Sequence, residues 1–411
     1  MAVAKLTAWA AKRDGTLNKF YTRSDVGDLL TSEIGAIEPG TAVDLGAGEG
    51  SLSAAVARRW PRVAITTVDV DPTCMSALDS ALKSAGCNLH AHRVLDVLSL
   101  DLPSEVGTRN FDMAVCNPPF YRPDWKREFA NILRNADLAE ACPTVTEATA
   151  EILFLAQSLR LVKTGGTIAI IIPDGLATGW PAVAFRRAIL QHHTVRTVVQ
   201  LPPYSFFDTE AFCFILVLEK GRVGPETPIK LLRLEDHGVV SDPILIDSQS
   251  AESRLDYAYH IVARSRPEGS TSLRELGADI RRGSLNTVQR KATGAFVFHT
   301  GDFPATSRFV SLGSDVPANA TKVLVIAEIG DILMARVDRE LHDKITLVNS
   351  GRFAITDCVY RIRLPKQHQR RVFDALTSQH GKRCIQAVTK GVGARLIGKG
   401  ELLDIPLLLS D

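Results

Sequence analysis

Hydrophobic and polar positions follow two alternating patterns over residues 41–220. Apolar, β-rich runs read TAVDLGAG, AITTVDVD, FDMAVCNP, GTIAIIIP, VRTVVQLP and FCFILVLEK. Stretches with helical spacing lie between them, such as Ser51–Trp60 and Cys74–Ala85, and Glu151–Leu161 predicts a buried amphipathic helix. Continuous apolar strands between helices are typical of a doubly wound, mostly parallel sheet with both faces covered. The pattern therefore predicts an α/β fold for this part of the chain.

The pattern changes after Lys220. GRVGPETP is polar and rich in Gly and Pro, and from Thr271 the chain shows short strands and many turns before a helix around Gln369–Val388. We predict one domain at 1–225, a linker at 226–265 and a smaller mixed α+β domain at 266–411. No apolar stretch approaches the roughly 20 residues that a membrane-spanning helix needs, so we expect no membrane association.

Charge is distributed unevenly along the chain, although the net charge is only +2. From Arg264 onward 23 Lys and Arg stand against 15 Asp and Glu, a surplus of +8, which leaves residues 1–263 at −6. A basic C-terminal half suggests a polyanionic partner, because phosphates attract Lys and Arg whatever the sequence of the nucleic acid. An ordinary solvated surface is the alternative.

The cysteines and the start of the chain bear on its compartment. The seven cysteines are scattered and never form a CxxC pair, which favours reduced thiols over a zinc site or a disulfide framework. Charged residues interrupt the first 20 positions too early for a secretory signal. We expect a cytoplasmic protein that holds no metal.

A glycine-rich segment, VDLGAGEGSLS, follows the first predicted strand and opens a helix. Asp44 ends the strand, Gly46 and Gly48 allow a tight turn, and Gly50 lets the backbone approach a ligand closely. No Lys-Ser/Thr pair follows, so the segment is not a P-loop. The next strand ends at Asp69, where a carboxylate could bind ribose hydroxyls. Dinucleotides and S-adenosylmethionine both need such a carboxylate.

The segment Asp44–Gly50 resembles motif I of class I methyltransferases. The resemblance implies S-adenosylmethionine as the cofactor, with Asp44 and the glycine turn holding its methionine portion and Asp69 its ribose. It also implies that Asp96 accepts a hydrogen bond from the cofactor's adenine amino group. The residues alone leave open that Asp96 is a turn or helix N-cap residue.

The fourth predicted strand runs directly into Asn117-Pro118-Pro119-Phe120. In an open α/β sheet, ligands bind beyond the carboxyl ends of the strands. Methylation of an exocyclic amine requires two acceptors for its N–H bonds, since they localise a lone pair that is otherwise delocalised into the ring. The Asn117 side chain supplies one acceptor and the Pro118 carbonyl a second, and the prolines add no competing N–H.

The tetrapeptide resembles the (N/D)PP(Y/F) signature of amino-methyltransferases. Adenine-N6 enzymes of that family typically begin it with Asn or Asp and cytosine-N4 enzymes more often with Ser, so Asn117 favours adenine. Phe120 offers an aromatic face to a base turned out of the duplex, where stacking contributes about 1–3 kcal/mol. The alternative is a simple turn with a packed aromatic.

Two flanking segments resemble γ-class DNA adenine methyltransferases. Lys19–Ser24 resembles their motif X, which implies that Thr22 contacts the cofactor's carboxylate, although Arg23 stands where the family usually has proline. A plain helix N-cap is the alternative for Thr22. Leu201–Phe207 resembles motif VIII, in which an aromatic packs against the target base. The register points to Phe206 ahead of its neighbours Tyr204 and Phe207, and ordinary core packing is the alternative.

The C-terminal half resembles a target-recognition domain of type I specificity subunits. The similar segments are Leu273–Gly283, Gly330–Val337 and Leu403–Leu407. The resemblance implies double-stranded DNA as the partner, read in a groove by Arg, Lys, Asn and Gln side chains. The candidate DNA-binding residues are Arg281, Arg282, Arg290, Lys291, Arg336 and Arg339.

These observations together predict an S-adenosylmethionine-dependent DNA adenine-N6 methyltransferase of a restriction–modification, defence or epigenetic system. Methylation of an RNA base or a protein glutamine amide is the nearest alternative, and a DNA-specificity protein with an inactive methylase half is another. A fused nuclease would need a carboxylate, one residue, then lysine, and that spacing occurs only at Asp124-Trp125-Lys126. We therefore expect a stand-alone methylase, with a separately encoded restriction endonuclease as a candidate partner.

Overall fold

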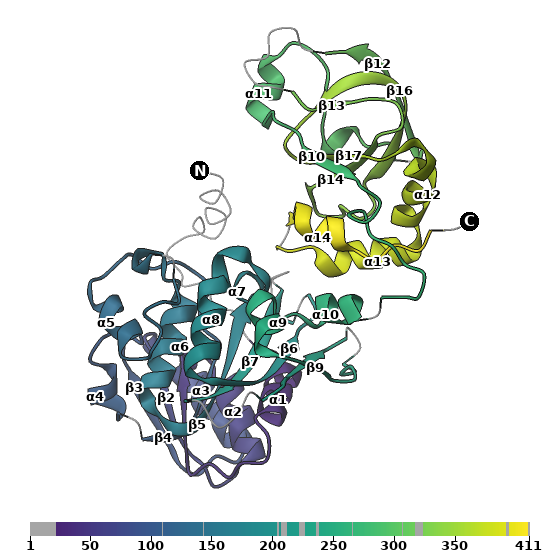
Figure 1. Ribbon diagram of the computed structural model, residues 1–411. Coiled ribbons are helices and arrows are strands. Elements are labelled where there is room, and N and C mark those ends of the chain that lie inside the picture. The colour runs from purple at the N-terminus through teal and green to yellow at the C-terminus, as the bar shows by residue number, and fades with distance from the viewer. Residues whose placement is uncertain are drawn as a thin grey trace. The chain divides into compact units, whose positions relative to one another are not determined.

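The computed structural model describes residues 22–108, 110–142, 144–203, 205–206, 212–221, 227–235, 238–264, 266–305, 307–316, 324–391 and 394–409. The chain divides into two compact units, unit 1 (Met1–Tyr257) and unit 2 (Ala258–Asp411) (Figure 1). Within the described residues, no helix combines the length and the apolar character needed to cross a bilayer.

Unit 1 is built on one large sheet. Its strands are β1 (Thr41–Leu45), β2 (Ala64–Asp69), β3 (His90–Val94), β4 (Phe111–Cys116), β5 (Val162–Pro173), β6 (Thr194–Gln200), β7 (Cys213–Glu219), β8 (Ile229–Arg233) and β9 (Ile244–Ile246). Its helices are α1 (Ser24–Glu33), α2 (Ser51–Arg59), α3 (Met75–Ser84), α4 (Leu102–Val106), α5 (Glu128–Arg134), α6 (Ala150–Leu161), α7 (Asp174–Thr178), α8 (Val183–His192) and α9 (Ser248–Ser253), and α10 (Tyr257–Arg264) follows.

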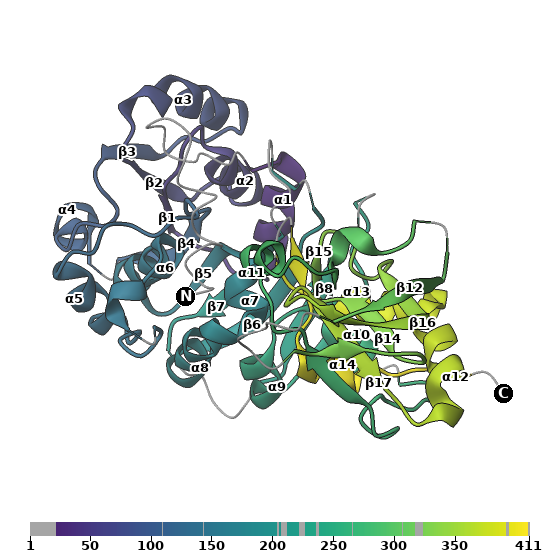
Figure 2. The same cartoon turned by 90° about the horizontal axis from the view of Figure 1, so that it is seen from above.

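The strand order is β3-β2-β1-β4-β5-β7-β6-β8-β9, and Figure 2 shows the first seven of these strands side by side. The pairs from β3 to β5 are all parallel, whereas β7 runs antiparallel between β5 and β6. The chain order reverses between β1 and β4, which lie next to each other. Such a switch point places the carboxyl ends of neighbouring strands around one crevice. The predicted doubly wound α/β fold is confirmed.

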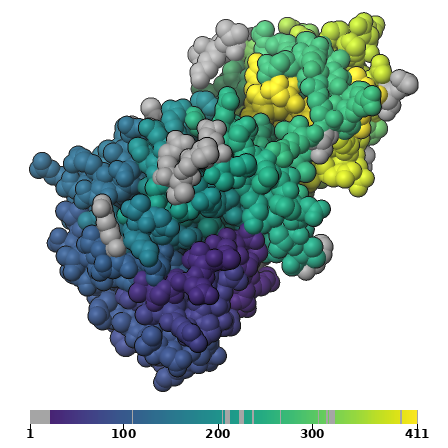
Figure 3. All heavy atoms as spheres, turned by 60° about the horizontal axis from the view of Figure 1, so that its bottom comes forward, coloured from purple at the N-terminus to yellow at the C-terminus, as the bar shows by residue number. Residues whose placement is uncertain are grey.

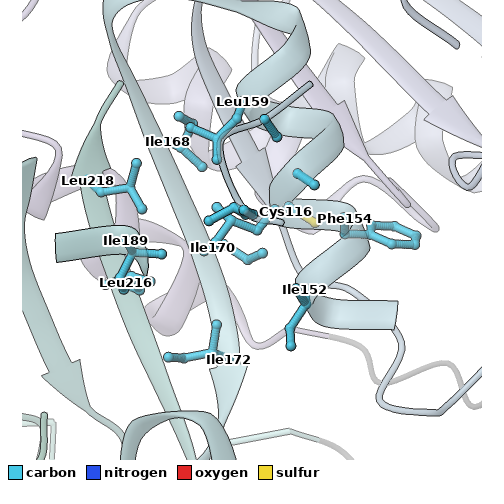
Figure 4. Close-up of a cluster of buried hydrophobic side chains, with 14 of the residues drawn as sticks. Cys116, Ile152, Phe154, Leu159, Ile168, Ile170, Ile172, Ile189, Leu216 and Leu218 are labelled. Atoms are coloured by element: carbon cyan, nitrogen blue, oxygen red, sulfur yellow. The ribbon is translucent and has the colours of Figure 1, made fainter. Parts of the chain in front are cut away.

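Helices cover both faces of this sheet. Side chains of α1, α2 and α3 join one buried cluster, and those of α4, α5, α6 and α8 join another on the opposite face. Strand β5 contributes to both, because Ile168, Ile170 and Ile172 belong to the second cluster while Ile171 belongs to the first. Figure 4 shows these three isoleucines between α6 and the leucines of β7. Burial on both faces explains the continuous apolar run in the sequence.

The segment predicted as a linker, 226–265, is mostly part of the folded units. Its strand β8 pairs with β6 in parallel and β9 pairs with β8 antiparallel, so both extend the large sheet of unit 1. The unit boundary lies at Tyr257, within the predicted linker. The boundaries therefore differ from 225 and 265, because short strands of mixed polarity carry little signal until a sheet edge is present to pair with them.

Unit 2 contains a second, mixed sheet and a small helical layer. Its strands are β10 (Asp279–Arg282), β11 (Val297–Phe298), β12 (Phe309–Asp315), β13 (Ile326–Ala327), β14 (Ile332–Ala335), β15 (Val337–Asp338), β16 (Ile345–Ile355), β17 (Val359–Arg363) and β18 (Arg395–Leu396). Its helices after α10 are α11 (Thr287–Ala292), α12 (Lys366–Thr377), α13 (Gln379–Val388) and α14 (Lys399–Asp404). The path β10-β17-β14-β16-β11 forms the sheet, and β12 and β13 also pair with β16.

One expectation for unit 2 is corrected. The helix expected around Gln369–Val388 is two helices, α12 and α13, separated at Ser378. The Ser378 hydroxyl accepts a hydrogen bond from the Gly381 N–H at 3.0 Å, which begins α13 as a new helix. Buried side chains of both helices belong to the same core cluster as β14 and β17.

Candidate active site

The glycine turn after β1 is built by backbone hydrogen bonds to the end of β2. The N–H groups of Gly46 and Ala47 donate to the Val68 carbonyl at 2.8 and 3.2 Å, and the Gly48 N–H donates to Asp69 Oδ2 at 2.8 Å. Gly46 and Gly48 have φ values of +73° and +51°, a region that glycine enters without steric cost. The expected glycine turn is therefore present, and Asp69 helps to hold it.

Gly50 is required twice over. It is the N-cap of α2 with φ +84°, and a Cβ atom there would lie 2.5 Å from Leu78 Cδ1. Any larger residue would require the Leu78 side chain on α3 to move aside. The first turn of α2 therefore begins close under the glycine turn, in the position that an anionic or polar ligand group favours.

Asp44 lies at the base of this turn and is 1% exposed. Its Oδ2 accepts a hydrogen bond of 2.5 Å from the Ser53 hydroxyl on α2. Burial raises the pKa of Asp44 to about 7; the Ser53 contact lowers that pKa and the nearby Asp69 carboxylate raises it further. Such a buried carboxylate is stabilised by a cationic ligand. S-adenosylmethionine, with its ammonium and sulfonium groups, fits this requirement.

The other two carboxylates that are expected to bind the cofactor, those of Asp69 and Asp96, lie at the ends of successive strands. Asp69 Oδ1 also accepts from the Asp71 N–H at 2.9 Å, so backbone groups contact both of its oxygens. Asp96 lies two residues beyond β3, where Oδ1 accepts from the Leu98 N–H at 2.8 Å and Oδ2 is 3.8 Å from Lys126 Nζ. The turn role that the sequence left open for Asp96 is therefore present. The cofactor roles of both residues stay predictions.

Asn117 follows directly after β4, whose last residue Cys116 pairs in register with Leu45 at the end of β1. The Asn117–Phe120 tetrapeptide and the glycine turn therefore start from the same edge of the sheet. The Asn117 amide donates through Nδ2 to the Thr22 hydroxyl at 2.9 Å. This contact turns the nitrogen end of the amide toward Thr22 and its oxygen end the opposite way.

Thr22 is buried and forms an isolated antiparallel bridge with Phe206. Helix α1 begins at Ser24 with Arg23 as its N-cap residue, so Thr22 is not the helix cap that the sequence left open. Three predicted elements, around Thr22, Asn117 and Phe206, thus meet at one place. The rest of the motif X segment, residues 19–21, lies outside the described residues.

The two expected aromatic residues occupy one buried cluster. Phe206 is 3% exposed and belongs to the cluster on the α1–α3 face, and the half-buried Phe120 packs against the same cluster. The core packing that the sequence left open for Phe206 is therefore present, and its contact with a base stays a prediction. Tyr204 and Phe207 lie outside the described residues.

Sequence reasoning missed Glu151, which it placed inside a buried helix without a role. Helix α6 begins at Ala150, whose N–H donates to the Tyr121 carbonyl at 2.9 Å, so its first turn is tied to the chain just after the tetrapeptide. Burial raises the pKa of Glu151 to about 7. The signal in the sequence was a carboxylate in an otherwise apolar helix (AEILFLAQ), where charge is costly to bury.

The candidate DNA-binding residues of unit 2 divide into two kinds. Arg290 and Arg336 are partly buried; Arg290 pairs with Asp302 at 2.9 Å and Arg336 Nε donates to the Asp357 carbonyl at 2.7 Å. The other four are exposed: Arg281, Arg282, Lys291 and Arg339. Arg281 and Arg282 form ion pairs with Asp279 and Asp357.

Comparison with known proteins places this geometry in a family. The model described as N-6 DNA Methylase matches residues 3–242, more than half of the 411 residues. The chain belongs to this family. Family membership implies S-adenosylmethionine as the cofactor of this N-6 DNA methylase, in agreement with the buried Asp44 and the glycine turn.

Individual relatives of the methylase are more distant. The tRNA1(Val) (adenine(37)-N6)-methyltransferase of Porphyromonas gingivalis is 30% identical over 101 residues, which cover 22% of this chain and 38% of the relative. Ribosomal RNA small subunit methyltransferase C of Klebsiella pneumoniae is 37% identical over 109 residues, 26% of this chain and 30% of the relative. The chain thus matches well under half the length of either protein.

A crystal structure of the type IIG restriction endonuclease BpuSI covers both units. It superposes with a TM-score of 0.56 at 13% sequence identity, over 97% of this chain and 59% of that protein. At this identity the likeness concerns the fold alone. It extends through unit 2 of the methylase, which the family model does not reach.

Proposed function

We propose that this methylase transfers a methyl group from S-adenosylmethionine to the N6 amino group of an adenine turned out of double-stranded DNA. One observation carries the proposal: Asn117, whose amide contacts Thr22, lies at the same edge of the sheet as the glycine turn that follows Asp44. An amine acceptor and a cofactor turn side by side are what methylation of an exocyclic amine requires.

The protein's own residues act by positioning and by electrostatics. When bound, S-adenosylmethionine supplies an electrophilic methyl group. The Asn117 amide oxygen and the Pro118 carbonyl oxygen accept hydrogen bonds from the two N–H groups of the amine. These two hydrogen bonds localise the nitrogen lone pair. The buried Asp44 offsets the cofactor's positive charge, and the rigid prolines keep the acceptors in place without an entropic cost at each turnover.

Phe120 and Phe206 serve the extruded base in this proposal. Turning a base out of the duplex costs a few kcal/mol, and stacking on an aromatic ring offsets about 1–3 kcal/mol of it. Phe120 directly follows the two prolines, and its ring packs against the cluster that contains Phe206. Two aromatic side chains near the acceptors, Phe120 and Phe206, support an aromatic base as the substrate over a glutamine amide.

Unit 2 is proposed as the DNA target-recognition domain, and the arrangement of the chain as that of a γ-class enzyme. The basic surplus of +8 from Arg264 onward falls almost wholly within this unit. Its sheet presents Arg281 and Arg282 on β10, in the segment that resembles the opening of type I recognition domains. Phosphate contacts would position the duplex, while other side chains read base edges. A separately encoded restriction endonuclease is the further partner that such a system would include.

The seven cysteines bear on where the protein works. All of them are free thiols in the structure, and five are buried. Unpaired cysteines suit the reducing cytoplasm. We therefore place the proposed reaction in the cytoplasm.

The test is a methyl-transfer assay with radiolabelled S-adenosylmethionine on plasmid DNA, tRNA, ribosomal RNA and a release-factor protein. We expect label on DNA alone, as N6-methyladenine. Single-molecule sequencing of host DNA, with and without the expressed gene, would then give the modified motif. Label on tRNA or ribosomal RNA and none on DNA would contradict the proposal and favour the reaction named for the RNA-modifying relatives.

A further inference from the structure

We propose that the Glu151 carboxylate accepts the proton that the adenine amino group loses when it is methylated. The inference rests on the proposed function and adds a proton acceptor to it. It is drawn from the position of Glu151 on α6, from its burial, and from the absence of any structural use for one of its oxygens among the described residues.

The first turn of α6 borders the catalytic loop on one side. The Ala150 N–H donates to the Tyr121 carbonyl at 2.9 Å. Glu151 therefore lies one residue after a helix residue that contacts the chain just beyond Phe120. Burial raises the pKa of Cys213, at the start of β7, and the Asp174 and Glu151 carboxylates raise it further, so Glu151 lies within electrostatic range of this thiol. Cys213 pairs with Pro173 at the end of β5. Glu151 therefore lies at the carboxyl edge of β4 and β5, where the tetrapeptide lies.

Helix α6 also borders the glycine turn, through a residue one turn after Glu151. Residues three apart on a helix share a face, so Glu151 lies one turn before Phe154. A Cβ atom on Gly46 would be 3.1 Å from Phe154 Cε1, so this face of α6 borders the glycine turn. In Figure 4 the Phe154 ring extends from α6 away from Ile168 and Ile170. Glu151 thus lies on the same side of α6 as Phe154, between the contact with the glycine turn and the contact with the chain beyond the tetrapeptide.

The Glu151 carboxyl is buried with only one of its two oxygens in contact with hydrogen-bond donors of the described chain. The residue is 5% exposed, and its Oε2 atom is buried with no hydrogen-bond partner among the described residues. Burial is the main reason that the pKa of Glu151 rises to about 7, while the Thr149 hydroxyl and the backbone N–H of Glu151 itself lower that pKa. Buried polar groups without partners are rare in native proteins and occur at functional sites.

Other buried polar groups on α6 have a structural role that Glu151 lacks. The Gln157 amide donates to the carbonyls of Val97 and Ser99 at 2.7 and 2.6 Å. The Ser158 hydroxyl donates to the Phe154 carbonyl within the helix at 2.9 Å. These contacts hold α6 against the loop after β3. The same helix therefore satisfies its polar groups where they serve the fold and leaves Glu151 Oε2 for another partner.

The chemistry of the proposed reaction needs such a group. The N6 lone pair forms the bond to the methyl carbon as that carbon leaves the sulfonium sulfur, which keeps the bonding pair. The nitrogen now carries a positive charge and one proton too many. As the nitrogen becomes tetrahedral, one of its two N–H groups turns from its carbonyl acceptor to Glu151. That N–H bond breaks, its electron pair returns to nitrogen, and an O–H bond forms on the carboxylate. Glu151 passes the proton to water after the product leaves.

Among Glu151 and the titratable groups around it, Glu151 is the group that we expect to change its charge near neutral pH. Burial raises the pKa of Tyr121 and raises that of Cys213 well above its ordinary value, so both stay neutral. Asp174, at the start of α7, raises the Cys213 pKa too, and its Oδ1 accepts from the Thr178 hydroxyl at 3.0 Å. Asp44 also has a pKa near 7 but lies under the cofactor turn. Saturating cofactor removes its effect on the rate.

The test compares single-turnover methylation rates of wild type, Glu151→Gln and Glu151→Asp from pH 5.5 to 9, on the full chain with saturating cofactor and DNA. The wild-type rate should rise about tenfold per pH unit below 7 and level off above it, because only the ionised form accepts a proton. Glu151→Gln should be about 100-fold slower at pH 8 and show no rise. Glu151→Asp should keep the rise at a reduced rate.

Glu147→Gln is the matched control. Glu147 is an exposed carboxyl in the same connection, four residues before Glu151, and its replacement should leave the rate and its pH profile unchanged. A second readout does not depend on activity. In the Asp44→Asn background, which removes the other carboxyl with a pKa near 7, the infrared carbonyl band of a protonated carboxylic acid should be present at pH 5 and fade between pH 6 and 8 in the cofactor-free protein. The band should be absent from the same difference spectrum when Glu151→Gln is added.

The outcomes separate this inference from the proposed function. If wild type labels RNA and not DNA, the DNA reaction fails before Glu151 is tested. If wild type methylates DNA and Glu151→Gln keeps both the rate and the pH rise, the proton-acceptor role is wrong and the proposed function stands. Circular dichroism at pH 8 checks folding, and we expect Glu151→Gln to be at least as stable as wild type, since a buried amide replaces a buried charge.

Discussion

The Asn117 amide donates a hydrogen bond of 2.9 Å to the Thr22 hydroxyl, across 95 positions of sequence. An amide has a donor end and an acceptor end, so a partner for the nitrogen decides where the oxygen points. Thr22 accepts only because its hydroxyl lies beside the end of β4, where a backbone bridge to Phe206 holds it. The proposed acceptor is thus oriented by a residue from the start of unit 1.

Replacing Thr22 by Val tests this relationship. Valine keeps the shape of threonine and removes the hydroxyl, so Asn117 loses the group that orients it. We expect the single-turnover rate to fall about 10- to 100-fold, in the range of a lost positioning contact. Thr22→Ser keeps the hydroxyl and should retain most of the rate. Calorimetric titration decides between roles: a large loss of cofactor affinity in Thr22→Val would favour the cofactor contact implied by motif X.

Replacing Asn117 by Ala removes the acceptor itself. We expect the methyl-transfer rate to fall by more than about 1,000-fold, because an acceptor for the amine is lost at the moment when charge develops. Cofactor affinity should remain within about twofold of wild type, since Asp44 and the glycine turn are untouched. Asn117→Asp keeps an acceptor oxygen and should retain measurable turnover. Wild-type turnover in Asn117→Ala would contradict the assigned role.

Gly50→Ala and Gly86→Ala form a matched pair. Both glycines have positive φ, +84° and +75°, so alanine is strained by about 1 kcal/mol or more at either site. At Gly50 a Cβ atom would also lie 2.5 Å from Leu78 Cδ1, whereas nothing lies within 4 Å at Gly86. In urea unfolding we expect Gly50→Ala to lose about 2–4 kcal/mol and Gly86→Ala about 1 kcal/mol. Equal losses would show that the Leu78 contact is unimportant.

The raised pKa of Asp44 predicts that the affinity for the cofactor depends on pH. Burial raises its pKa from 3.8 to about 7, so the folded protein without cofactor holds a proton that the unfolded chain releases. Stability of that form should therefore fall as the pH rises from about 4 to about 7. A cationic ligand favours the ionised carboxylate, so affinity for S-adenosylmethionine should rise through the same range and level off above pH 7.

Calorimetric titration from pH 5.5 to 8.5 measures this effect. Asp44→Asn should bind S-adenosylmethionine more weakly at pH 8 and show a flat profile over the range. S-adenosylhomocysteine lacks the sulfonium charge and should show a smaller rise in wild type than S-adenosylmethionine does. A wild-type affinity that does not change with pH would mean that Asp44 does not titrate on binding.

Lys291 and Arg336 should differ in what their replacement removes. Lys291 is exposed on α11, so Lys291→Ala should weaken DNA binding about equally for all sequences and reduce the salt slope by about one. Arg336 is partly buried and donates to the Asp357 carbonyl at 2.7 Å. Arg336→Ala should instead lower the unfolding free energy by about 1–3 kcal/mol. Filter binding against salt and urea unfolding distinguish the two results.

Much of unit 1 follows from local sequence. The buried strand runs, the spacing of Gly46, Gly48 and Gly50, and the tetrapeptide after β4 all specify structure within a few residues of themselves. A left-handed turn needs glycine, and a strand covered on both faces needs a continuous apolar run. For this reason the doubly wound fold and the position of Asn117 at a strand end could be predicted. Figure 3 shows one face of the molecule with its side-chain atoms, which cover the secondary structure that these local patterns predict.

The edges of the large sheet were harder to predict. Strands β8 and β9 lie in the segment expected to be a linker, because short runs such as Ile244–Ile246 gain a partner only once β6 is in place. The single helix expected near the C-terminus divides at Ser378, where a side-chain cap competes with helix continuation. In both cases the deciding hydrogen bond is a feature of the folded chain.

The amino-acid sequence by itself determined the sheet, the glycine turn and the position of the tetrapeptide at a strand end, because each depends on residues close together in the chain. Tertiary structure alone decided that Thr22 contacts the Asn117 amide, that Asp44 lies buried near Asp69, and that Glu151 is buried with one oxygen that has no hydrogen-bond partner among the described residues. These properties depend on which distant groups share a low-dielectric space. Burial and hydrogen-bond partners across tens of residues are set only when the strands have assembled.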